Sequence, residues 1–201
     1  LTSLEVAISI IKAKTGDGPP VVTLEDAESA IGTQALQYGR GEHYDTISAF
    51  IKSIRGSDPD AGLYWLSRMI EAGEDARFIA RRLVILASED VGMADSRALL
   101  VADAAARAVE FVGFPEAQLN LAHAVIYLAN APKSNSVTKA IFGALEDARS
   151  TRGDVPKHLR DSHYSGASGL GHGEGYKYPH EFPNGWIEQQ YRPDKIEAHR
   201  Y

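Results

Sequence analysis

Acidic and basic side chains gather where one predicted helix ends and the next begins. Glu89 and Asp90 lie near the end of a helix that also carries Arg81 and Arg82, and Arg97 lies on the next helix. Paired carboxylates in a cleft can transfer protons. Carboxylates flanked by arginines more often form structural ion pairs. We therefore predict that these five residues form an ion-pair cluster that fixes the turn, and we assign no catalytic residue.

Two patterns near the C-terminus are typical of ligand sites. Four histidines lie close together in the sequence, but their spacing matches no familiar zinc site; they are His158, His163, His172 and His180. The alternating glycines from Gly169 to Gly175 lack the preceding strand and following helix of a phosphate-binding loop. We therefore predict no metal and no cofactor site in this segment, and interpret it as a turn-rich connector.

Composition narrows the possible classes of protein. The chain has 201 residues and no cysteine, which excludes disulfide bonds, a thiolate nucleophile and cysteine-ligated metals. No segment reaches the roughly 20 apolar residues of a membrane helix, and no signal-peptide pattern opens the chain. We therefore expect a cytoplasmic protein with no membrane partner. The net charge of -6 argues against a broad basic surface.

A local basic patch can still occur on an acidic protein. The basic residues that could form a DNA contact are Lys52, Arg55, Arg68, Lys133 and Lys139. The alternative is that these side chains lie on separate, solvated helix faces. The sequence does not decide between the two interpretations.

Apolar residues recur at helical spacing along most of the chain, so we predict an all-α fold. Residues 1–40 predict a small helix pair, and a composition break from Gly39 to Glu42 indicates a domain boundary. Residues 41–155 predict a bundle of antiparallel or orthogonal helices joined by short loops. Residues 156–201 have no clear periodicity, but their many aromatic residues predict an extended tail that docks on the bundle.

Two of the predicted helices carry apolar residues on more than one face. In the helix over 59–71, Trp65 and Met69 lie away from the main apolar stripe. In the helix over 115–131, the second face consists of Leu121, Val125 and Leu128. Because a monomer would expose such second faces, we predict that these residues form an interface between copies of the chain.

Several long runs resemble one family. They are HYDTISAFIKSIRGSDPDAGLYWLSRMIEAG (43–73), RRLVILASEDVGMADSRAL (81–99), YLANAPKSNSV (127–137), DVPKHLRD (154–161) and YKYPHEFP (176–183). Together they are similar to the C-terminal region of the RarA/MgsA replication-associated recombination ATPases, whose eukaryotic relatives are the Werner-helicase-interacting proteins. The resemblance covers nearly the whole chain.

The resemblance implies a division of labour within a longer protein. An AAA+ domain would hydrolyse ATP with Mg²⁺, a helical lid would follow, and a helical C-terminal domain would assemble a homo-tetramer. Residues 1–40 resemble the end of the lid. The chain has no GxxxxGK[ST] loop, so we expect no ATPase activity of its own.

The resemblance also implies a cellular role. The assembled parent protein would act on DNA at stalled replication forks, in replication, recombination and repair, near the nucleoid. Single-strand-binding protein would be a partner. Two alternatives from other classes stay open: a free-standing helical scaffold that binds protein or nucleic acid, and a small hydrolase using Glu89 and Asp90, although the sequence indicates no substrate pocket for the latter.

Overall fold

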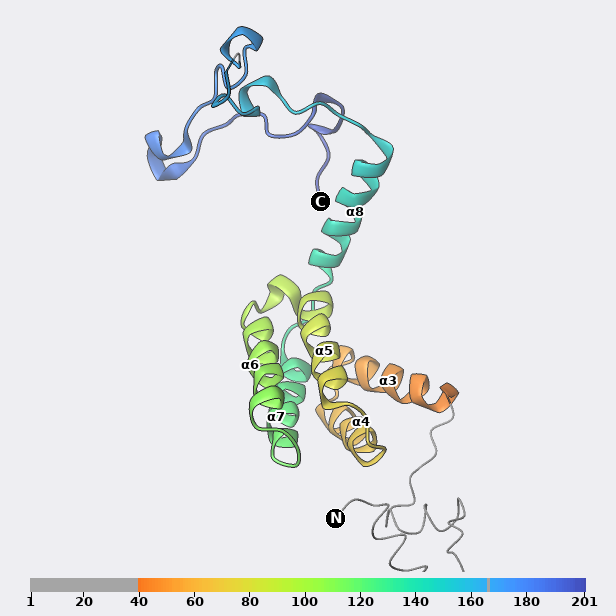
Figure 1. The fold of residues 1–201 in the computed structure, drawn as a ribbon. Coiled ribbons are helices and arrows are strands. Elements are labelled where there is room, and N and C mark those ends of the chain that lie inside the picture. Colours follow the sequence, from red (N-terminus) through yellow and green to blue (C-terminus); the bar gives the residue numbers. More distant parts are fainter. Residues whose placement is uncertain (1–39, 166) are drawn as a thin grey trace, which may run out of the picture. The chain divides into compact units, whose positions relative to one another are not determined.

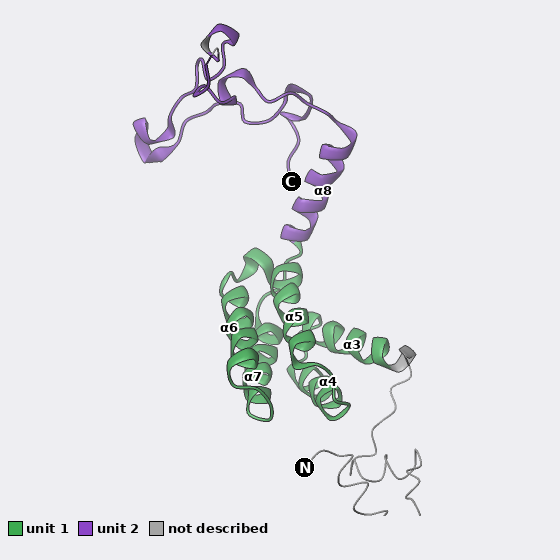
Figure 2. Ribbon diagram, in the orientation of Figure 1, with its two compact units in different colours: residues 1–135 green, residues 136–201 purple. Residues whose placement is uncertain are grey.

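The computed structural model describes residues 40–165 and 167–201, and these fall into two compact units (Figures 1 and 2). The first unit ends at Asn135 and the second spans Ser136–Tyr201. Helices and turns make up the described residues, in which no strand occurs, so the predicted all-α class is confirmed. The helix pair predicted within residues 1–40 lies almost wholly outside the described residues.

The first unit contains five α-helices. They are α3 (Arg40–Arg55), α4 (Pro59–Glu71), α5 (Ala76–Leu86), α6 (Arg97–Phe111) and α7 (Ala117–Asn130). A π-helical turn (Ala87–Val91) and a 3₁₀ turn (Gly92–Ala94) connect α5 to α6. Because α3 begins at Arg40, residues 40–42 of the predicted boundary lie inside a helix.

Local sequence signals set the ends of these helices. Asp58 caps α4 by accepting a hydrogen bond from the Ala61 N–H, and Pro59 occupies the first helical position, as the sequence predicts. The Asp75 side chain caps α5 in the same way, through the Arg77 N–H. The chain therefore turns where short polar side chains satisfy the free N–H groups of the next helix.

Helix α7 lies at the centre of the first unit and contacts α3, α4, α5 and α6 (Figure 1). Gly62 of α4 allows a close approach, because a Cβ atom there would lie 2.9 Å from Val125 Cγ1 and 3.2 Å from Ile54 Cγ1. Phe50 and Ile54 of α3 are fully buried in the same core. α3 is therefore an integral part of the bundle.

The second unit contains α8 (Ser136–Ser150) and the segment that follows it, which has five 3₁₀ turns among its described residues (Figure 2). The sequence analysis placed this helix in the central domain, whereas the structure groups it with the C-terminal segment. Asp147 of α8 accepts hydrogen bonds from His199 Nδ1 at 2.6 Å and from the Tyr201 hydroxyl at 2.7 Å. The end of the chain is thus attached to α8.

This attachment predicts a pH response. The hydrogen bond from Tyr201, and then that from His199, hold the pKa of Asp147 below its ordinary value of 3.8. A lowered folded-state pKa stabilises the attachment above the ordinary value, and this stabilisation is lost as pH falls through the lower, folded-state pKa. Asp147→Ala should therefore speed hydrogen–deuterium exchange of residues 195–201 several-fold at neutral pH. Glu146→Ala, at the exposed neighbouring position, is the control, and equal rates in the two variants would contradict the attachment.

Candidate functional site

The π-helical turn places Asp90 against the end of α3. Asp90 is buried, and its Oδ1 accepts a hydrogen bond from Arg55 Nε at 2.5 Å. Glu89 is half-exposed and its Oε1 lies 3.5 Å from Arg55 Nη2. The hydrogen bond with Asp90 raises the pKa of the Arg55 guanidinium and is the largest cause of that shift. Arg55 and Asp90 therefore join two helices that are distant in the sequence.

Lys133 completes this junction from the end of α7. Its Nζ donates to the carbonyl oxygens of Ala131 at 2.6 Å and Ala129 at 2.8 Å, and to Ser57 Oγ at 3.1 Å. Burial lowers the pKa of Lys133, and the nearby charge of Asp90 opposes that shift. The backbone N–H of Ser134 donates to the Asp90 carbonyl at 2.7 Å. Lys133 thus links the end of α7 to Ser57, which follows α3.

The predicted ion-pair cluster has different partners in the structure. Arg81 lies 3.9 Å from Asp75, and Arg97 hydrogen-bonds Asp95 at 3.1 Å. Asp90 instead pairs with Arg55, which lies outside the predicted set, and Glu89 lies 3.5 Å from the same arginine. The prediction that Asp90 pairs with Arg81, Arg82 or Arg97 is therefore wrong. Asp90 lies in the π-helical turn, whose i→i+5 winding departs from the regular helical spacing on which the prediction rests, and its partner Arg55 is 35 residues away in the sequence.

Asp95 belongs to a second polar group, in which its contact with Tyr127 was not predicted from the sequence. It accepts a hydrogen bond from the Tyr127 hydroxyl at 2.7 Å as well as from Arg97. These bonds, that from Tyr127 first, lower the pKa of Asp95, and the bond to Asp95 raises that of Tyr127. The residue spacing of 32 gives no local signal for such a contact, which joins the start of α6 to α7.

The basic residues predicted to contact DNA have different surroundings in the structure. Arg55 and Lys133 are engaged in the junction described above. Arg68 is half-buried, with its guanidinium 6.0 Å from the centre of the Trp65 ring. Lys52 and Lys139 are exposed, but they lie in different units. The structure therefore leaves Lys52 and Lys139 as the accessible members of the predicted set.

The residues predicted to form an interface between copies lie mostly in the core of the first unit. Leu121, Val125 and Leu128 are fully buried, Met69 is almost fully buried, and Trp65 is half-buried against the core. The prediction of two apolar faces on α7 is correct, but their assignment is reversed. Helical periodicity separates the two faces without indicating which one meets α3 and α4.

The helices α6 and α7 carry exposed apolar side chains outside the set that the sequence predicted for an interface. Leu119 of α7 is 70% exposed and Phe111 of α6 is 92% exposed. Leu100 and Ile126 are also exposed. We call Leu119 and Ile126 of α7 the outer apolar face. Single exposed apolar residues are normal, but Leu119 and Ile126 lie on the same side of α7, two turns apart, which indicates an interaction surface.

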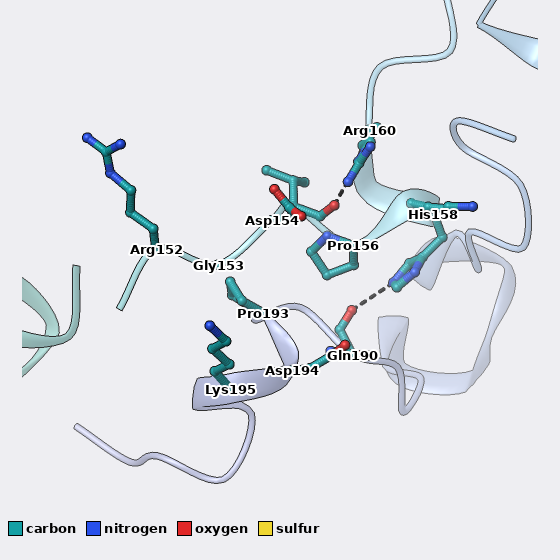
Figure 3. A pocket seen from close by; sticks show the side chains of 12 residues that line it. Arg152, Gly153, Asp154, Pro156, His158, Arg160, Gln190, Pro193, Asp194 and Lys195 are labelled. Atoms are coloured by element: carbon teal, nitrogen blue, oxygen red, sulfur yellow. Dashed lines mark hydrogen bonds between the residues drawn. The ribbon is translucent and has the colours of Figure 1, made fainter. Parts of the chain in front are cut away.

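The second unit contains a polar pocket between two segments of its irregular chain (Figure 3). Residues 152–160 form one wall and residues 190–195 the other, around a cavity of about 410 Å³. Four basic side chains line it: Arg152, Lys157, Arg160 and Lys195. We call this the basic pocket. The sequence analysis missed it because its two walls are separated by about 30 residues and neither has a regular period.

Other classes of site have little support in the described part of the chain. Residues 40–165 and 167–201 contain no group of three or more acidic or histidine side chains arranged to hold a metal ion. Within the same ranges, no helix is both long and apolar enough to span a membrane.

Comparison with known proteins identifies the family. Residues 56–201 match the family described as MgsA AAA+ ATPase C terminal, and residues 1–55 match the AAA C-terminal domain. The chain belongs to the MgsA AAA+ ATPase C-terminal family. The boundary between the two matches falls at the end of α3, although α3 packs into the same core as the MgsA-family helices.

Curated relatives of the MgsA family match nearly the whole chain. An AAA domain-containing protein of Mycobacterium tuberculosis is 55% identical over 98% of the chain, which covers 43% of that protein. Replication-associated recombination protein A of Bacillus subtilis is 49% identical over 100% of the chain and 48% of its own length. The ATPase WRNIP1 of Dictyostelium discoideum is 39% identical over 90% of the chain and 21% of its own length. The chain spans less than half the length of these relatives.

Proposed function

We propose that this chain is the assembly region of a DNA-dependent AAA+ ATPase that acts in replication, recombination and repair at stalled forks. The proposal combines the MgsA-family membership with the name of the Bacillus relative. In this role the chain forms a homo-tetramer and does not hydrolyse ATP, since the nucleotide and Mg²⁺ bind to a preceding ATPase domain. Assembly holds several ATPase modules at high effective concentration, which strengthens weak DNA contacts.

The outer apolar face is the observation that supports assembly. Leu119 and Ile126 lie seven residues apart, two helical turns, so they share one side of α7. The opposite side of α7 fills the core, and the outer side is exposed to solvent. A copy of the same chain can cover such a face with its own, and closed symmetry leaves no further apolar surface open.

The mass of the chain in solution tests this proposal. Light scattering at micromolar concentration should give about four times the chain mass of 21.8 kDa. Leu119→Glu should lower that mass and leave the helical circular dichroism unchanged, because the buried charge would oppose association. Asn120→Glu adds the same charge about 100° around the helix and serves as the control. A monomeric wild-type chain would refute the proposal.

A free-standing helical scaffold is the second candidate, and one groove favours it. The groove lies between α5 and α6, has a volume of about 520 Å³, and is mainly apolar with arginines at its rim. Ala80, Val84 and Ala106 line its floor, and Arg77 and Arg107 stand beside it. A monomeric chain that binds a peptide in this groove would fit the scaffold rather than the assembly region.

A further inference from the structure

We propose that the basic pocket of the second unit binds a backbone phosphate of a single-stranded nucleic acid. This inference rests on the proposed function for its biological setting, but its geometry is independent of assembly. It concerns residues that lie far in the sequence from the outer apolar face and in the other compact unit.

The walls of the basic pocket are held together by contacts that do not use its cations. A Cβ atom on Gly153 would lie 2.2 Å from Pro193 Cβ, so glycine is required for the two segments to approach this closely. His158 Nε2 forms a 2.7 Å hydrogen bond with the Gln190 carbonyl across the pocket (Figure 3). The Gln190 amide donates to the Asp194 carboxylate at 2.7 Å. The pocket therefore has a fixed frame.

The charges around this frame suit an anion. Arg152, Lys157 and Lys195 are exposed and form no ion pair with any residue in the described ranges. Arg160 uses its Nε to bind the Val155 carbonyl at 2.8 Å, which orients its guanidinium and leaves the terminal N–H groups for another acceptor (Figure 3). Two carboxylates, Asp154 and Asp194, also line the pocket, so cations exceed anions. A metal ion would be repelled by this excess.

A phosphate group suits this lining. Arginine binds phosphate by forked hydrogen bonds, and lysine binds it as a point charge. The cavity volume of about 410 Å³ exceeds what one phosphate occupies and falls within the range of about 300–1,000 Å³ for ligand sites. One sugar–phosphate unit of a longer strand would therefore fit in the pocket, while the adjacent nucleotides of the strand lie outside it.

Two features of the second unit favour a nucleic-acid strand. Acidic and basic residues are equal in number over residues 136–201, so the net charge of -6 comes from the preceding residues. A polyanion thus meets least repulsion at this unit. Trp186 and Tyr191 lie close to Gln190 in the sequence, and their side chains are 70% and 52% exposed. Exposed aromatic rings can stack on the unpaired bases of a single strand.

The test measures binding of a fluorescent 20-nucleotide single-stranded DNA to the full 201-residue chain. The double variant Arg152→Glu/Lys195→Glu should weaken binding at least tenfold and make the dependence on salt less steep. Arg149→Glu/Lys177→Glu changes the net charge of the same unit equally at exposed positions outside the pocket, and should weaken binding much less. An equal loss of DNA affinity in the two double variants would overturn the proposal, because it would show that affinity depends on the net charge of the unit and not on the pocket.

Further probes separate the chemistry of the ligand. An oligonucleotide with an uncharged methylphosphonate backbone should bind at least tenfold more weakly, and tighter binding of duplex than of single-stranded DNA would refute the single-strand assignment. Gly153→Ala changes no charge but forces the two walls of the pocket apart, so it should also weaken DNA binding. Unchanged binding would show that the strand does not bind between these walls. Light scattering of the same variants should show unchanged mass. Lost DNA binding with assembly intact supports this site, whereas a monomeric wild-type chain that still binds DNA refutes only the assembly.

Discussion

Leu121→Ala should lower the free energy of unfolding by about 3 kcal/mol, as expected when a fully buried leucine in a well-packed core is truncated. Leu121 is completely buried against the helices around α7. Leu119→Ala, two residues away, should change the free energy of unfolding of the dissociated chain by less than about 0.5 kcal/mol, because the Leu119 side chain is already exposed to solvent.

Urea denaturation at a concentration where the chain is dissociated measures both changes. The comparison is sharp because the two variants make the same substitution on the same helix. A stable Leu121→Ala variant with reduced mass in light scattering would reverse the assignment of the two faces. It would place Leu121 in the interface, as the sequence analysis predicted.

Arg55→Met should also destabilise the chain, by about 3 kcal/mol, because it leaves the buried carboxylate of Asp90 without the cation that hydrogen-bonds it. Removing the other partner, by Asp90→Ala, should lower the free energy of unfolding by less. Asp90→Ala removes the buried charge itself, and the Arg55 side chain is 45% exposed, so water can solvate it again. Glu89→Ala, which removes the longer and more exposed contact to Arg55, should have an effect below about 1 kcal/mol.

A double-mutant cycle tests this order. Arg55→Met combined with Asp90→Ala should be more stable than Arg55→Met alone, since the double variant no longer buries an unpaired charge. Methionine keeps most of the aliphatic stem, so lost packing contributes little to the difference. Additive effects of the two single substitutions would show that Arg55 and Asp90 do not interact in solution.

The junction around Asp90 also limits where DNA can bind. Lys133 Nζ donates to Ser57 and to two backbone carbonyls, so it is not available to a phosphate without breaking internal bonds. The charge of Arg55 is already paired with the buried carboxylate of Asp90. The exposed, unpaired cations of the basic pocket are better placed. The sequence does not show whether the N–H groups of a basic residue already donate to acceptors within the folded protein.

The sequence determined the α-helices found among the described residues and many of their ends. Asp58 and Pro59 predict the start of α4 correctly, because capping depends on residues within one turn. The all-α class followed from the periodic apolar residues, which recur over every helix of the first unit. The long runs between residues 43 and 183 also identified the family, since ordered matches of that length carry far more information than a short motif.

Only the tertiary structure decided which face of each helix is inside and which charges meet. Leu119 and Leu121 both fit the helical period of α7, and the packing of α3 and α4 against one side selects Leu121 for the core. Asp90, in the π-helical turn, meets Arg55 of α3, which is 35 residues away in the sequence, and no spacing rule for regular helices predicts such a contact. The basic pocket likewise depends on Gly153 and Pro193 meeting across 40 residues of chain. Contacts between residues far apart in sequence depend on the whole packing arrangement, and local patterns do not encode it.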